Sequence, residues 1–92
     1  MKNAIIIKTG YTAGTYGNTG EIFCLVQAFE SGFSTYYFNG QYGSEYRVKE
    51  VLEAQGWKVQ TNAGYYGRMT AKEAKGAFSE YQMIELLKEG SK

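Results

Sequence analysis

Residues 22–39 read IFCLVQAFESGFSTYYFN, and this stretch decides the fold. Residues 22–29 are almost continuously apolar, which is typical of a central β-strand covered on both faces. Residues 33–39 alternate two sets of side chains, and most of them favour strands. Glu30-Ser31-Gly32 leaves room only for a tight turn. The stretch therefore predicts an antiparallel hairpin.

The hairpin extends towards the N-terminus. Residues 3–11 alternate with Ile5, Ile7 and Tyr11 on one face, so they predict a strand. Residues 11–20 are rich in Gly and Thr and form the connection, with a turn tip at residues 17–20. The first 39 residues thus predict a three-stranded antiparallel meander.

A helix follows the meander. Ser44 is a favourable N-cap, and Glu45 lies in the first turn, where the helix dipole favours a carboxylate. The apolar stripe consists of Val48, Val51 and Leu52. Gly56 suits a left-handed stop, so the helix is expected to end near Gln55.

The C-terminal third predicts a fourth strand over residues 57–65, with one solvated face. Thr70 and Glu73 then form a capping box, and the chain carries a second one in Ser79-Glu80-Tyr81-Gln82. Two alternatives remain. A continuous helix over residues 71–89 would carry Gly76 at a cost of about 1 kcal/mol. The favoured alternative is a short first turn, a break near Gly76 and a helix over residues 80–89.

Together these elements predict a single α+β domain spanning residues 1–92, in the order β-β-β-α-β-α. We expect a four-stranded, mainly antiparallel sheet with two helices on one face. A crossover after the third strand is simplest if the fourth strand joins beside the first.

The residue types that the chain lacks exclude several classes of function. The 92 residues include no His, no Asp and no Pro, and the net charge is +1. Without His or Asp, the usual acid–base residue and the common metal ligands are absent. We therefore expect no enzyme activity, no cofactor and no metal. The single Cys24 lies in an apolar run, where it is expected to be a buried small hydrophobe, and no stretch is long enough for a membrane span. The expected location is the cytoplasm.

A four-residue pattern, Gly-x-Tyr-Gly, occurs three times, at residues 14–17, 40–43 and 64–67. Each copy is interpreted as a loop. Glycine permits unusual backbone angles, and tyrosine offers a large, rigid contact surface, which is a combination typical of protein-binding loops. The predicted partner-binding residues are Tyr11, Tyr16, Asn18, Tyr42, Tyr65, Tyr66 and Arg68.

Two alternatives stay open. The first is a small nucleic-acid-binding protein that uses the three-stranded sheet, with Lys2 and Lys8 on phosphates and Tyr36 and Phe38 stacked on bases. The second is a nucleotide or phosphate site at the glycine-rich helix entrances near residues 44 and 70. Neither has a matching motif, and the cation content is low for both.

In general character the chain resembles small phage-encoded inhibitors of bacterial defence, such as anti-CRISPR proteins. The features that carry the resemblance are one short domain, no catalytic residues, Gly/Tyr-rich loops and an initiator Met1. It implies a non-catalytic module that binds a protein, such as a bacterial defence complex in the host cytoplasm, and occludes its surface.

Overall fold

The computed structural model describes residues 2–13, 20–40, 43–66 and 69–90. Their order is the predicted β-β-β-α-β-α, with the C-terminal helix divided in two. The elements are β1 (Lys2–Ala13), β2 (Gly20–Phe29), β3 (Gly32–Asn39), α1 (Ser44–Ala54), β4 (Trp57–Tyr66), α2 (Ala71–Lys75) and α3 (Glu80–Gly90).

The four strands form one mixed sheet in the order β3-β2-β1-β4. β1 pairs with β2, and β2 with β3, in antiparallel fashion, whereas β4 runs parallel to β1. The prediction that the fourth strand joins beside the first is therefore confirmed. Because β2 alone runs in the opposite direction, β1, β3 and β4 all end at the same end of the sheet.

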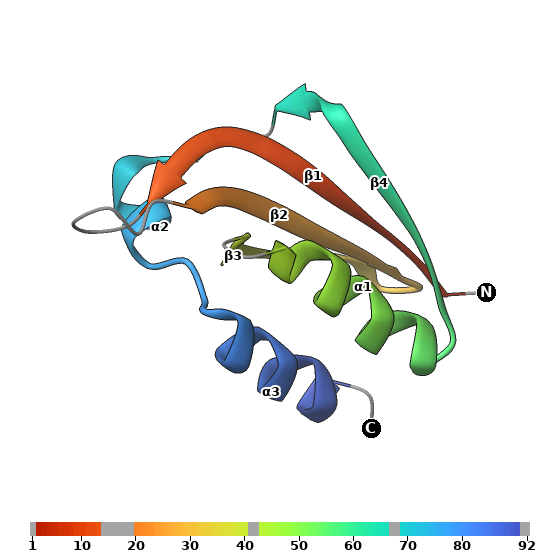
Figure 1. Cartoon of the computed structure of the whole chain (residues 1–92). Helices are drawn as coiled ribbons and strands as arrows, with labels where there is room; N and C mark the ends of the chain where they lie inside the picture. The colour runs from red at the N-terminus through yellow and green to blue at the C-terminus, as the bar shows by residue number, and fades with distance from the viewer. Residues whose placement is uncertain (1, 14–19, 41–42, 67–68, 91–92) are drawn as a thin grey trace.

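Helices α1 and α3 pack side by side on one face of the sheet (Figure 1). The core lies between them and this face, because alternate strand residues point towards the helices. Its buried members are Ala4, Ile6, Leu25, Phe38, Val48, Leu52, Trp57, Val59, Met83 and Leu87.

Helix α2 takes a different position, at one end of the opposite face. Met69 and Ala74 bury Ile22 there in a second, smaller core. The chain then passes the outer edge of β3, where the amide of Asn39 donates to the carbonyl of Phe78 over 2.9 Å. The break near Gly76 is therefore confirmed, and the chain uses it to cross from one face of the sheet to the other.

Both predicted capping boxes are present. The Thr70 hydroxyl accepts from the amide of Glu73, and the Glu73 carboxylate accepts in return from the amide of Thr70. Ser79 and Gln82 make the corresponding pair of bonds at the start of α3.

The predicted N-cap of α1 is wrong by one residue. Gly43 occupies the cap in a left-handed conformation, with φ 77°, and makes no side-chain cap bond. Ser44 is instead the first helical residue and is buried. A glycine can turn the chain sharply from β3 into α1, and this turn places Ser44 inside the helix.

Candidate functional site

Half of the sheet face opposite α1 and α3 is left uncovered by the described helices. Two rows of side chains cross this half, one from each strand, because neighbouring strands are in register. We call these eight residues the open face. The first row is Lys58, Asn3, Ala28 and Phe33, and the second is Gln60, Ile5, Val26 and Thr35.

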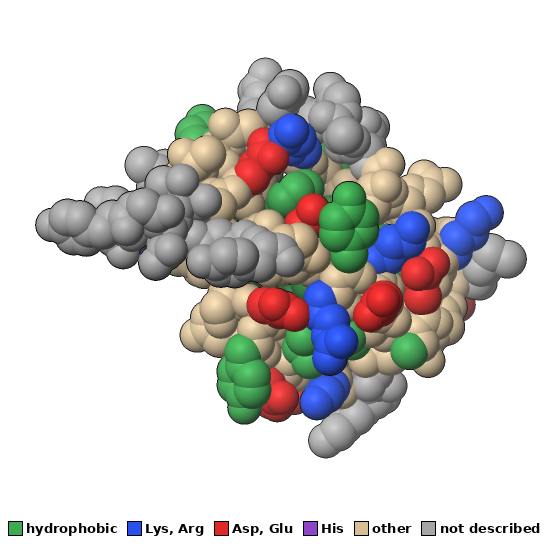
Figure 2. Space-filling model, in the orientation of Figure 1, with side chains coloured by type: hydrophobic (Ala, Val, Ile, Leu, Met, Phe, Trp, Pro, Cys, Tyr) green, Lys and Arg blue, Asp and Glu red, His purple; other side chains and the backbone are tan. Residues whose placement is uncertain are grey.

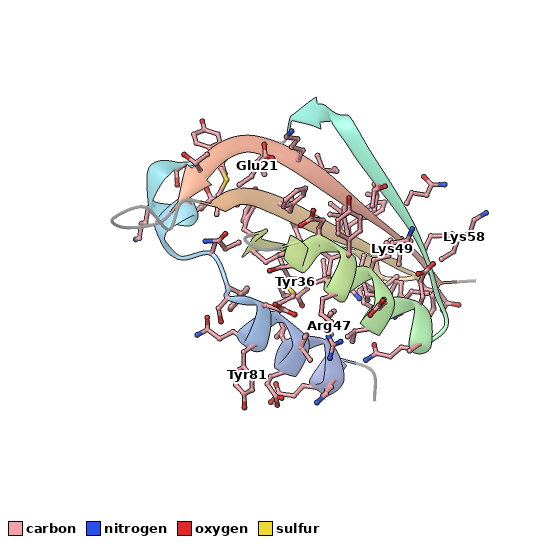
Figure 3. All side chains as sticks on the ribbon, in the orientation of Figure 1. Glu21, Tyr36, Arg47, Lys49, Lys58 and Tyr81 are labelled. Carbon is pink, nitrogen blue, oxygen red and sulfur yellow. The ribbon has the colours of Figure 1, made fainter. Side chains whose placement is uncertain are left out.

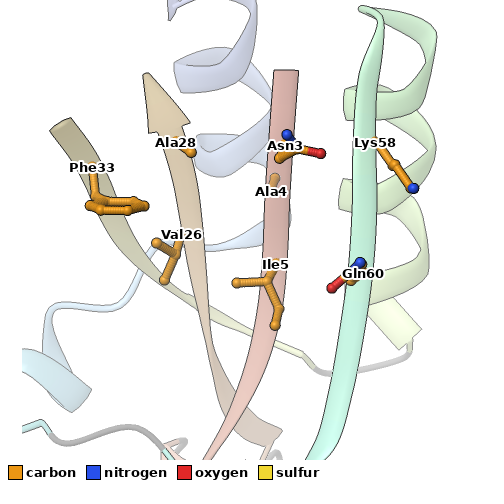
Figure 4. A pocket seen from close by; sticks show the side chains of 8 residues that line it. All are labelled: Asn3, Ala4, Ile5, Val26, Ala28, Phe33, Lys58 and Gln60. Atoms are coloured by element: carbon orange, nitrogen blue, oxygen red, sulfur yellow. The ribbon is translucent and has the colours of Figure 1, made fainter. Parts of the chain in front are cut away.

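The open face is apolar at its centre and polar towards one edge. Ile5, Val26 and Ala28 are only half-buried, and Phe33 beside them is 78% exposed. The β4 side carries Lys58 and Gln60, both exposed. These side chains line a groove of about 350 Å³ (Figure 4).

The open face stops where α2 begins. Ile22 lies under Met69 and Ala74, and Cys24 is buried as predicted. Burial, and to a lesser degree the Glu73 carboxylate on α2, raise the pKa of the Cys24 thiol to about 11. The prediction that β2 is covered on both faces is thus right at its beginning and wrong over Val26 and Ala28.

The predicted tyrosine surface belongs to the other end of the sheet. β1, β3 and β4 lead into the three Gly-x-Tyr-Gly copies from the same end, as a shared surface requires. Tyr11, on β1, is 44% exposed there. Tyr16, Asn18, Tyr42 and Arg68 lie outside the described residues. The prediction that they bind a partner stays a prediction.

The third copy is not a loop. Residues 64–66 belong to the end of β4, so the backbones of Tyr65 and Tyr66 are part of a strand. The pairing jumps there, from Ile7 opposite Asn62 to Lys8 opposite Tyr66. A glycine within a strand often accompanies such a bulge, which explains why the pattern resembles a loop in the sequence.

The open face and the tyrosine end are separate surfaces. The groove lies at the start of β1, around Ile5, whereas Tyr11 lies near the end of β1 and Tyr66 pairs opposite Lys8. Six residues of strand separate Ile5 from Tyr11, which corresponds to roughly 20 Å. Phe33 and its neighbours were not among the predicted site residues. The sequence does carry a signal for this surface, because the predicted fold places both helices on one face of the sheet and so leaves the other face uncovered.

The sheet does not present the residues that the nucleic-acid alternative requires. Phe38 is fully buried, and Tyr36 packs against Phe78 on the helix side (Figure 3). Lys8 forms a 3.3 Å ion pair with Glu21, and Lys2 lies over the Trp57 ring. Phe38 is therefore not available for base stacking, and Tyr36 is half-buried on the face that α1 and α3 cover.

The helix entrances are equally unsuited to phosphate. Their first turns carry Glu45 in α1 and Glu73 in α2, and the Glu73 carboxylate already occupies the amide of Thr70. A carboxylate at this position repels an anion. The helix side of the molecule intermixes Lys, Arg and Glu side chains, without a large patch of one sign (Figure 2).

Within the described part of the chain, no group of three or more acidic, Cys or His side chains is placed to hold a metal ion. In the same residues, no helix is long and apolar enough to cross a membrane. Comparison of the chain with protein-family models, curated proteins and solved structures finds no match.

Proposed function

We propose that this chain is a non-catalytic protein-binding module and that the open face is its main contact surface. The observation that supports the proposal is the half-buried apolar centre of this face, formed by Ile5, Val26 and Ala28, together with Phe33 on the edge strand beside it, which exposes 78% of its surface. An apolar patch with a polar rim is typical of protein interaction sites.

The side chains of the open face indicate which kind of surface its partner presents. Phe33 offers an aromatic anchor that fits a pocket or a flat apolar surface. Lys58 is the charged side chain of the groove, so the matching surface carries a carboxylate beside its apolar centre. The amides of Asn3 and Gln60 add polar contacts at the rim. The partner is thus a protein with an apolar patch and an acidic margin.

The tyrosines at the other end of the sheet provide a second contact. We propose that Tyr16, Tyr42 and Tyr66 reach the same partner when it is large enough to span both ends. Tyrosine buries a large area while it orders few rotatable bonds, so such contacts bind at low entropic cost.

The finer form of the proposal is an inhibitor that occludes a surface of a bacterial defence complex, as the resemblance to anti-CRISPR proteins implies. Its test is a plaque assay. Expression of the chain in bacteria whose CRISPR system targets a phage restores plaque formation if the finer form is right, and unchanged resistance contradicts it.

The binding surface is tested by capturing partners on immobilised wild-type protein and on two variants. Phe33→Glu places a charge beside the apolar centre of the open face. Tyr81→Glu is the matched control, since Tyr81 is 73% exposed on α3, on the opposite side of the sheet. Phe33→Glu is expected to lose the captured protein, whereas Tyr81→Glu retains it. Thermal melting of each variant verifies that the fold is intact.

Charge reversal then tests the acidic margin of the partner. Lys58→Glu is expected to weaken binding, and a Glu→Lys or Asp→Lys change in the partner is expected to restore it. Equal capture by wild type and by both open-face variants contradicts the proposal. If capture is lost only on Tyr16→Ala, Tyr42→Ala or Tyr66→Ala, the tyrosine end is the main surface instead.

A further inference from the structure

A second cleft lies on the helix side of the sheet, between α1 and the strands. Its volume is about 290 Å³, and it is on the side opposite to the open face. The lining residues are Ile6, Lys8, Glu21, Phe23, Glu45, Tyr46 and Thr61. We call it the α1 cleft. Its charged and aromatic lining distinguishes it from the groove of the open face.

The charges in the α1 cleft do not balance. Lys8 Nζ lies 3.3 Å from Glu21 Oε2, so this lysine and this carboxylate neutralise each other. Glu45 remains as a second carboxylate. Its Oε2 atom is buried and has no hydrogen-bond partner among the described residues.

Among the ion pairs of the described residues, none joins Glu45 to a cation. Lys49 lies one turn further along α1 (Figure 3), but the ion pairs among the described residues do not include Glu45 with Lys49. A buried carboxylate oxygen without a donor costs free energy, and this cost is recovered when the Glu45 side chain turns into the cleft and accepts from an incoming donor.

Two aromatic rings complete the α1 cleft. Tyr46 is 68% exposed, and Phe23 lies deeper, where its ring stacks on Phe38 with centroids 5.8 Å apart. The face of an aromatic ring attracts a cation, and a planar guanidinium stacks on it especially well. The cleft thus combines an acceptor without a donor and an aromatic wall.

We propose that the α1 cleft binds a guanidinium or a primary ammonium group. The Glu45 carboxylate accepts its hydrogen bonds, and the ring of Tyr46 packs against the plane of the cation. An anion is disfavoured because Lys8 is already paired. The cation comes either from a free small molecule or from an arginine or lysine side chain of another protein. This proposal does not depend on the open face, which is on the other side of the sheet.

The test is an NMR titration of the ¹⁵N-labelled protein with matched pairs of ligands. One pair is the peptide acetyl-Gly-Gly-Arg-Gly-Gly-amide and its citrulline counterpart, which has nearly the same shape without the charge. Ethylguanidinium is the free small cation. For ligands of this size, we expect saturable shifts of the Glu45 and Tyr46 amides with a Kd of about 1–10 mM. The citrulline peptide is expected to bind at least about tenfold more weakly.

Variants assign the acceptor. Glu45→Gln keeps the shape of the side chain and is expected to weaken binding of the arginine peptide at least about tenfold. Glu50→Gln is the control, because Glu50 is an exposed acid of the same helix. Tyr46→Ala, at an exposed position that is not expected to affect folding, weakens binding about threefold or more.

The relative affinities identify the source of the cation. Tighter binding of the arginine peptide than of ethylguanidinium indicates a protein side chain, and the reverse order indicates a small molecule. Three results overturn the proposal: no saturable shift up to about 50 mM ligand, equal binding of the citrulline peptide, or unchanged affinity in Glu45→Gln. None of them bears on the Phe33 capture experiment, so the two proposals fail separately.

Discussion

At the scale of single residues, Gly40 joins β3 to the turn before α1. Its amide donates to the carbonyl of Glu21 over 2.7 Å, which holds this turn against the beginning of β2. A Cβ at this position would overlap the ring of Phe23. Since that ring stacks on the buried Phe38, it has little room to move. The absence of a side chain at residue 40 therefore allows the sheet and the turn to pack closely.

Gly40→Ala is expected to destabilise the fold by about 1–3 kcal/mol, as overpacking of a core does. Gly76→Ala is the matched control. A Cβ at Gly76 meets only ordinary contacts, and its φ is −88°, so the substitution is expected to be neutral or to stabilise by up to about 1 kcal/mol. Urea unfolding measures both, and equal stabilities of the two variants would contradict this account of Gly40.

Cys24 makes the stability of the fold sensitive to alkaline pH. Its thiol pKa is raised from 9.0 to about 11, first by burial and then by Glu73. The folded state therefore holds the proton more tightly than the unfolded state does. The resulting stabilisation is fully present below pH 9 and is lost as the pH rises to about 11. The pKa of the neighbouring Tyr37 is also raised, mainly by burial, and acts in the same direction.

We expect the unfolding free energy to fall between pH 9 and about 11, and to fall less steeply in Cys24→Ala. The comparison uses the slope against pH, because removal of the thiol also changes packing at every pH. Chemical denaturation at several pH values provides the unfolding free energies from which these slopes are calculated. Identical slopes for wild type and Cys24→Ala would show that this thiol does not titrate differently in the folded state.

At the scale of elements, the amphipathic pattern of α1 carries much of the core. Val48 and Leu52 are fully buried, and Trp57 follows directly after Gly56, whose φ of 90° ends the helix. Leu52 and Trp57 belong to the same core cluster. Arg47 adds an ion pair across the helices, with its Nε 4.0 Å from the Glu80 carboxylate of α3.

Leu52→Ala is expected to destabilise the protein by about 2–5 kcal/mol, because it removes buried methyl groups and leaves a cavity. Glu53→Ala, at the exposed neighbouring position, is expected to change stability by no more than about 0.5 kcal/mol. Thermal melting curves of both variants measure these changes in stability. A melting temperature of Leu52→Ala within error of wild type would show that this helix face is not part of the core.

Elements with a strong local signal could be predicted from the sequence. The capping boxes at Thr70 and Ser79 set where α2 and α3 begin, and Gly56 ends α1. The cap before Ser44 could not be predicted, because the preceding Gly43 turns the chain through a left-handed conformation and removes the serine from the cap position. Likewise, Gly64 looks like a turn residue by itself, and only the pairing of Asn62 and Tyr66 with β1 on either side of it shows that it lies in β4.

At the scale of the whole molecule, geometry leaves one sheet face partly bare. Four strands about 4.8 Å apart span roughly 15–20 Å, and two helices about 10 Å apart cover that width once. α1 and α3 therefore complete one face, and the five-residue α2 covers only the end of the other. The open face is a consequence of this helix count. The sequence predicts the helix count and the strand order, but not which residues remain uncovered.

The candidate site likewise has one part that the sequence predicts and one part that it does not. The tyrosine residues are predicted from residue type alone, and β1, β3 and β4 run in the same direction. The open face depends on the register of four strands, which places Phe33 in one row with Ala28, Asn3 and Lys58. Long-range register is set by packing and not by local sequence, so this row could not be predicted from the sequence.

The most direct test of the open face as a binding surface is methyl cross-saturation NMR on the complex with the captured protein partner. Saturation of the partner is expected to reach the methyl groups of Ile5, Val26 and Ala28, which lie on the open face, and to spare those of Leu52 and Met83 in the core. Saturation transfer that leaves Ile5, Val26 and Ala28 unaffected while the partner is bound would contradict the account.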